Sequence, residues 1–193
     1  MTGTWPLGWA TGDVETAAEF KKGIGAIADT TLGGSAANVD MTSISATYAH
    51  LLLVIYARSD QAAQSVYVQL QFNGDTAANY DSQRLTGGGA SVLAAELFAQ
   101  TSAICGHMPA ATAGANLFGA SIAFIPHYAG TTNNKLALSI SAEKAGTTTG
   151  SMNNNLAAAF WRSSAAINRI TLIPNAAANF VAGTRVTLYG MGA

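Results

Sequence analysis

The stretch "VYVQLQFNGDTAANYDSQR", residues 66–84, indicates the fold class. Its first seven residues alternate between apolar and polar side chains, which is the period of a half-buried β-strand. Asn73-Gly74 follows directly, and this dipeptide is the strongest short-range signal of a hairpin turn. We therefore expect a strand that ends in a turn. The side chains expected in the core are Val66, Val68, Leu70 and Phe72.

The polar end of this stretch fits either a turn or a calcium site. Calcium takes oxygen ligands from Asp, Asn and carbonyl groups, but the glycine and glutamate positions of an EF-hand loop are not matched here. Short polar side chains such as Asp75 and Asn79 commonly bond to the loop backbone. We expect a turn held in this way and anchored by the ring of Tyr80, with no metal.

Further strand-like segments follow one another from residue 39 to the end of the chain. "HLLLVIYAR" is apolar on both faces, which predicts a central strand covered on both sides. In "SIAFIP" we expect Ile122 and Phe124 to point inward, and "KLALSIS" sets Leu136, Leu138 and Ile140 against smaller or polar residues. Residues 91–99 fit a helix or a strand. The pattern predicts one all-β domain, residues 39–193, an antiparallel β-sandwich of jelly-roll type.

Residues 1–38 differ from this pattern and are expected to form an N-terminal arm. "GDVETAAEFKKG" has the cap and charge pattern of one short helix. Trp5, Trp9 and Phe20 carry large apolar surface outside the sandwich. Such side chains favour burial against a partner, so the arm is interpreted as an anchor.

Composition limits the function classes. Only 10% of the residues are charged and the net charge is -1, without the basic patch that nucleic acid requires. The low charge favours burial of surface against other chains. No apolar run is long enough to cross a membrane, and no secretory signal is evident, so synthesis in a cytoplasm is expected.

No motif specifies a reaction or a cofactor. Cys105 and His107 are two residues apart, but zinc normally takes four ligands. No G-x-S-x-G elbow is present, and Asp75 and Asp81 are the only acidic pair within one loop. We expect neither catalytic residues nor a cofactor.

The ordered segments "TYAHLLLVIYARSD", "VQLQFNGDTAANYDSQ", "IPHYAGTTNNK" and "WRSSAAINRITLIPNAAANFVAGTRVTLYGM" resemble a group of bacteriophage and prophage virion proteins. These proteins share a β-sandwich module that ends in F-x-A-G-[ST]-x-x-x-L-Y-G. The resemblance covers roughly residues 43–193. The signature residues here are Phe180, Gly183, Leu188, Tyr189 and Gly190.

The resemblance implies a non-enzymatic virion structural protein, located on the virion after synthesis in the host cytoplasm. A capsid decoration or cement protein is the first expectation, because no fibre shaft precedes the sandwich. A head fibre belongs to the same group, and a tail-fibre or tail-tip receptor-binding protein is the alternative. The implied partners are further copies of the chain in a homotrimer, the major capsid protein or tail proteins, and a host surface glycan.

Tyr80, Tyr128 and Trp161 are the aromatic residues that could stack on such a glycan or lie in an interface. A third class, an independent carbohydrate-binding or hydrolytic module, stays open.

Overall fold

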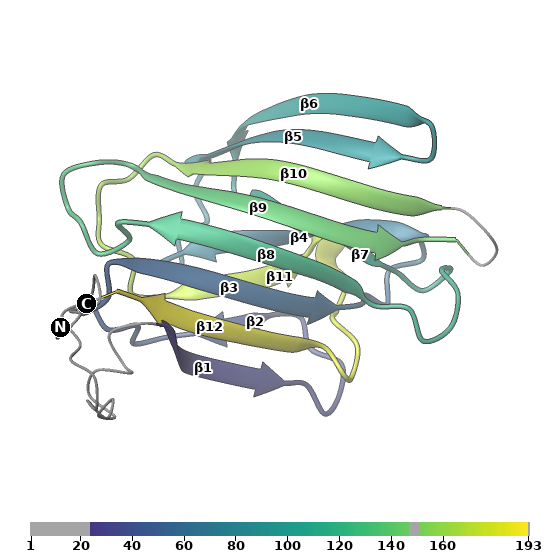
Figure 1. Ribbon diagram of the computed structural model, residues 1–193, viewed down its shortest axis with the longest axis horizontal. Coiled ribbons are helices and arrows are strands. Elements are labelled where there is room, and N and C mark those ends of the chain that lie inside the picture. Colours follow the sequence, from purple (N-terminus) through teal and green to yellow (C-terminus); the bar gives the residue numbers. More distant parts are fainter. Residues whose placement is uncertain (1–23, 147–150, 193) are drawn as a thin grey trace, which may run out of the picture.

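Two antiparallel β-sheets pack face to face as a sandwich in the computed structural model, which describes residues 24–146 and 151–192 (Figure 1). The larger sheet has eight strands and the smaller sheet has four. The expected all-β, antiparallel sandwich is therefore confirmed. The described residues contain no helix that is long and apolar enough to cross a membrane.

The eight-stranded sheet forms the front layer in Figure 1, with β1 at one edge and β6 at the other. Every neighbouring pair in it is antiparallel. In spatial order its strands are β1 (Ile24–Thr31), β12 (Arg185–Met191), β3 (His50–Ala57), β8 (Gly119–Pro126), β9 (Lys135–Lys144), β10 (Met152–Trp161), β5 (Tyr80–Gly88) and β6 (Ser91–Gln100).

The four-stranded sheet lies behind it (Figure 1). In spatial order its strands are β2 (Val39–Met41), β11 (Ile170–Pro174), β4 (Ser65–Phe72) and β7 (Ala103–Pro109). A single 3-10 turn, Asn175–Ala177, follows β11. The undecided segment at residues 91–99 is a strand, since β6 pairs with β5 along its length.

The alternating stretch of β4 behaves as its sequence predicts. The four expected side chains, from Val66 to Phe72, are all buried in the core. Asn73 and Gly74 both have positive φ, 54° and 69°, as in a type I′ turn, and the Asp75 amide donates to the Phe72 carbonyl at 2.9 Å. The turn does not close a hairpin, because β4 and β5 lie in different sheets. These four side chains belong to the main hydrophobic core together with Leu51 and Leu53 of β3 and Leu188 of β12.

Strand β7 approaches the inner face of the large sheet unusually closely. A Cβ atom built on Gly106 would lie 2.2 Å from Ser121 Oγ and 2.9 Å from Ser121 Cβ. The backbone amide of His107 donates to Ser141 Oγ at 3.1 Å, and the amide of Ile104 donates to Ser82 Oγ at 3.0 Å. The free edge of β7 is thus hydrogen-bonded by serine hydroxyls of the opposite sheet, because only small residues there leave room for the backbone.

This close approach reverses the expected facing of β8. The expectation that Ile122 and Phe124 point inward is wrong: the side chain of Ile122 is 51% exposed, and both belong to the outward face. The residues that alternate with them, Ser121 and Ala123, are buried. Strand β9 follows the same rule, since its small residues face inward and Leu136, Leu138 and Ile140 face outward. The small sheet can lie this near because the side chains that β8 and β9 direct toward β7 are small.

The boundary of the expected N-terminal arm also changes. Ile24–Thr31 forms β1 and pairs with β12, and Ala36 bridges to Phe180, so residues 24–38 belong to the sandwich. The expected helix and the anchor residues Trp5, Trp9 and Phe20 lie outside the described residues.

Candidate interaction surface

The most prominent functional feature is the side of the eight-stranded sheet that faces away from the small sheet. Most of its outward positions on β3, β8, β9 and β10 are apolar, and the apolar surface continues to Leu85 on β5. Gln83 on β5 and Asn154 on β10 are exposed polar positions of the same side. We name this surface the outer apolar face. Its members are Leu52, Val54, Tyr56, Leu85, Ala120, Ile122, Phe124, Leu136, Leu138, Ile140, Ala142, Leu156, Ala158 and Phe160.

Strand register places these side chains in rows across the sheet. Ile122 pairs with Ile140, Ile140 pairs with Leu156, and Leu156 pairs with Leu85. Val54 extends this row on the other side, as the partner of Ile122. Paired residues of adjacent strands lie on the same face of a sheet, so the row runs without interruption over five strands.

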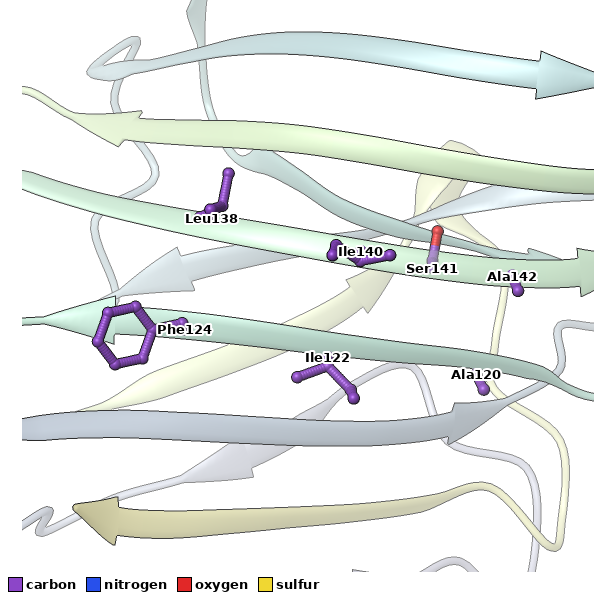
Figure 2. Close-up of a pocket in the computed structure, with 7 residues that line it drawn as sticks. All are labelled: Ala120, Ile122, Phe124, Leu138, Ile140, Ser141 and Ala142. Carbon is purple, nitrogen blue, oxygen red and sulfur yellow. The ribbon is translucent and has the colours of Figure 1, made fainter.

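A shallow groove of about 410 Å³ lies on this face over β8 and β9 (Figure 2). Ile122 and Phe124 line it from β8, and Leu138 and Ile140 line it from β9. The side chain of Ile140 is 64% exposed. The side chains that line the groove are aliphatic or aromatic where they contact solvent. The groove can therefore bind apolar surface, but it offers no group for acid–base chemistry.

Two ion pairs lie at the edges of this face. Next to β12, Arg185 forms an ion pair with Asp29 at 2.7 Å. Next to β10, Arg162 forms an ion pair with Asp81. Hydrogen bonds hold the pKa of both carboxyl groups below its usual value, from Arg185 to Asp29 and from the Ala99 amide and Arg162 to Asp81. An apolar centre with a polar rim is the ordinary anatomy of a protein interface.

A second feature is a cluster of polar side chains inside the sandwich. Glu143 on β9 is fully buried and accepts hydrogen bonds from Ser65 and from Asn153, the latter at 3.0 Å. His107 Nδ1 lies 3.5 Å from Glu143 Oε1. The ring of His107 also meets the ring of Tyr67 edge-on at 4.5 Å. The cluster thus joins β4, β7, β9 and β10.

Ser65, His107 and Glu143 are the residue types of a hydrolytic triad, but the hydrogen bonds among them are arranged differently here. In a triad the histidine bonds to the serine and the acid bonds to the histidine. Here Ser65 donates its hydrogen bond to Glu143, and both nitrogens of His107 lack a hydrogen-bond partner. The arrangement does not activate Ser65 as a nucleophile.

Cys105 lies in the core beside this cluster. It is fully buried, and burial raises the pKa of its thiol. A thiol of raised pKa is a poor nucleophile and a poor metal ligand. Within residues 24–146 and 151–192, no three His, Cys, Asp or Glu side chains gather as a metal site would require.

The loop after β4 is a hydrogen-bonded turn. Asp75 accepts from the Ala77 amide at 2.9 Å, from Asn79 at 2.9 Å and from Trp161 Nε1 at 2.7 Å. The Trp161 hydrogen bond is the largest of the causes that lower the pKa of Asp75. Tyr80 anchors the loop as expected, with its hydroxyl bonded to the Phe72 amide at 2.8 Å.

The three aromatic residues considered for glycan stacking are buried. Tyr80, Tyr128 and Trp161 are at most 3% exposed, so their ring faces are not available to a sugar. Tyr80 and Trp161 stack on each other with ring centroids 6.3 Å apart. Burial also raises the pKa of Tyr80 to about 12. The glycan expectation for these residues is corrected: each is a core residue.

The C-terminal signature residues have structural positions that explain their identity. Phe180 and Leu188 are fully buried. Gly183 has a φ of 86°, and a Cβ on Gly190 would lie 2.4 Å from the ring of Tyr48. Tyr189, on β12, is half-buried. These residues lie along the final loop and strand and do not converge on a site.

A second cavity of about 560 Å³ lies between β1 and the segment after β2. Hydroxyl groups of Thr42, Ser43, Ser45 and Tyr48 line part of it, and its other walls are apolar. No charged side chain is among the described residues that line it, so it supplies no obvious chemistry.

No protein-family model matches this chain, and no curated protein matches it.

Sequence reasoning missed the outer apolar face because alternation predicts two faces without saying which one is covered. The large residues of β8 and β9 were the natural core candidates. Lys135 also indicated the wrong facing, because a lysine in phase with Ala137 and Ser139 predicts that this side of β9 meets solvent. In the structure Lys135 is buried and its ammonium donates to the carbonyls of Asn133 and Ser164. The signal that agreed with an apolar surface was the low overall charge.

Proposed function

We propose that this protein is a non-enzymatic structural protein of a bacteriophage virion. The observation that carries the proposal is the outer apolar face, in which the central strands β8 and β9 expose Ile122, Leu138 and Ile140 to solvent. An apolar patch at the upper end of the range found on monomers is often functional and marks a candidate interaction site. A protein that works by assembly needs such a face.

The sequence resemblance supplies the virion as the particle into which the chain assembles. The sandwich supports it, because the chain crosses repeatedly between two sheets, as a jelly-roll-like domain does. The arrangement of Ser65, His107 and Glu143 supports a non-enzymatic role, since it lacks the serine–histidine link of a hydrolase.

Within the virion, a capsid decoration or cement protein is the proposed role, as a homotrimer that contacts the major capsid protein. A tail-fibre or tail-tip receptor-binding protein is the second candidate. Burial of Tyr80, Tyr128 and Trp161 removes the residues on which glycan contact was expected, and this favours decoration over receptor binding.

Labelling of particles tests the proposal. Antibodies raised against the isolated protein, coupled to gold, are applied to purified virions and viewed by electron microscopy. Gold distributed over the head supports decoration, gold confined to the tail supports the second candidate, and particles without gold contradict both. Particles from phage that lack the gene serve as the control for antibody specificity.

The residues before β1 carry a separate part of the proposal, anchoring to the particle. Removal of residues 1–23 spares β1, whereas removal of residues 1–38 would delete an edge strand of the sandwich. We expect the shorter truncation to melt like the full chain but to be absent from particles. Full incorporation of the truncated protein would contradict an anchoring role.

A further inference from the structure

We propose that a second copy of this chain covers the outer apolar face. The inference builds on the proposed assembly role, because it names the partner of the same surface. It is tested on the isolated protein, so its failure can be told apart from a failure of virion localisation.

The first argument is area. Seven large side chains of the face are each more than two-fifths exposed: Tyr56, Leu85, Ile122, Leu136, Leu138, Ile140 and Leu156. Together they expose on the order of 600 Å² of apolar surface, the upper end of the range for the largest patch on a monomer. A standard interface buries about 800 Å² on each partner. With the half-buried members of the face added, this surface is large enough for a stable contact between copies.

The second argument is charge. The ion pairs at the rim, Asp29 with Arg185 and Asp81 with Arg162, are each formed within one chain. Both pairs are internally balanced, so these parts of the rim carry no excess of one sign. A strongly charged partner would gain little from the apolar centre of this surface, whereas a second copy brings an equally apolar one.

The third argument is the shape and pattern of the sheet. Strand β3 is apolar on both sides, as fits a strand covered on both faces. The small sheet covers one side, where Leu51 and Leu53 are fully buried, while Val54 and Tyr56 stay partly or largely exposed on the other. A sheet of another copy would complete this arrangement, because sheets pack face to face through interdigitated apolar side chains about 10 Å apart.

Residues 1–23 are the competing occupant, since they lead into β1 at one edge of the same sheet. The two occupants differ in their dependence on concentration. Cover by a segment of the same chain is independent of concentration, whereas cover by a second copy is lost on dilution.

The experiment measures thiol labelling of Ile140→Cys in the full-length protein over a dilution series. Cys105 is the only native cysteine and is fully buried, so it gives a low background. Leu93→Cys is the matched control: Leu93 is 53% exposed but pairs with Thr86, on the opposite side of the same sheet.

We expect maleimide to label Ile140→Cys at least about tenfold more slowly in concentrated than in dilute protein, because only the free fraction reacts. The rate for Leu93→Cys should stay constant. Fast labelling of Ile140→Cys at every concentration, or slow labelling that dilution does not relieve, would overturn the inference. The second result would assign the cover to the same chain.

Light scattering after size exclusion provides the second measurement. The wild type should have at least twice the 19.7 kDa mass of one chain, because a face that packs on the same face of another copy pairs two chains. Ile140→Lys should reduce the mass to one chain, and Leu93→Lys should not. Circular dichroism melts verify that both variants fold. A wild type of single-chain mass, or a folded Ile140→Lys variant of full assembled mass, would refute self-association through this face.

Discussion

Gly106→Ala tests the central packing claim of the fold, that β7 lies against the large sheet at glycine distance. The new Cβ would lie 2.2 Å from Ser121 Oγ and 2.9 Å from Ser121 Cβ. Side chains do not approach one another so closely, so β7 or β8 must shift. The shift would lengthen or break the hydrogen bond from the neighbouring His107 amide to Ser141 Oγ.

Two terms set the expected magnitude. Overpacking of a close-packed core costs about 1–3 kcal/mol. A buried amide that loses its hydrogen bond costs about 1–3 kcal/mol more. We therefore expect Gly106→Ala to reduce the free energy of unfolding by about 2–6 kcal/mol. In a chain of this length that corresponds to a fall in Tm of roughly 4–24 °C.

A compensating substitution makes the prediction specific. Ser121→Gly removes both atoms that clash with the new methyl group, which leaves Ser141 Cβ at 3.3 Å as its nearest neighbour. The double variant should therefore be more stable than Gly106→Ala alone, although Ser121→Gly alone costs up to about 1 kcal/mol. Gly87→Ala is the control, because Gly87 is also a strand glycine and a Cβ there meets nothing within 4 Å.

Urea unfolding and circular dichroism melts, at one fixed protein concentration, measure the four variants and the wild type. Gly87→Ala should stay within about 1 kcal/mol of the wild type. A neutral Gly106→Ala, or a double variant no more stable than Gly106→Ala, would refute the close approach of β7 to β8.

Three further substitutions test separate parts of the chain. Leu188→Ala removes a fully buried side chain of β12 and should cost about 2–5 kcal/mol in urea unfolding; an unchanged midpoint would contradict its core position. Gly190→Ala places a methyl group 2.4 Å from the Tyr48 ring and should destabilise by about 1–3 kcal/mol, with part of the loss recovered in the double variant with Tyr48→Ala. Asp75→Asn cannot accept from all three donors of the carboxylate, so it should cost about 1–3 kcal/mol at neutral pH. Because the folded pKa of Asp75 is lowered, the advantage of the wild type should be full above the unfolded value of about 4 and disappear as pH falls through the folded value; melts from neutral to acidic pH measure it, and a constant gap would contradict the assigned hydrogen bonds.

Local sequence signals were sufficient for β4 and for the turn that follows it. Alternation in β4 placed Val66 to Phe72 correctly, because one side of that strand is apolar and the other is not. Asn73-Gly74 specified the turn, because both residues adopt positive φ there. In β4 and its turn, the residues that determine the local structure lie within the same short segment of the chain.

The pairing of β1 with β12 could not be predicted in the same way. Ile24–Thr31 is a glycine- and alanine-containing segment without clear alternation, and it becomes a strand only because the edge of β12 is available for hydrogen bonding. The prediction that aromatic residues contact a glycan was wrong for a related reason. Tyr80 and Trp161 were judged by residue type, whereas their burial depends on β5 and β10 lying side by side over Phe72.

The facing of β8 and β9 depends on a contact that is distant in sequence. Gly106 admits the β7 backbone only where the opposite sheet carries small side chains, and Ser121 and Ser141 meet that condition. Since side chains alternate, small residues inward place Ile122 and Ile140 outward. The alternation of small and large side chains along β8 and β9 therefore has two consequences. It lets the two sheets pack closely, and it makes the outer face apolar. A substitution that exchanged large and small residues between the faces of β9 would overfill the interior and remove the assembly surface at the same time.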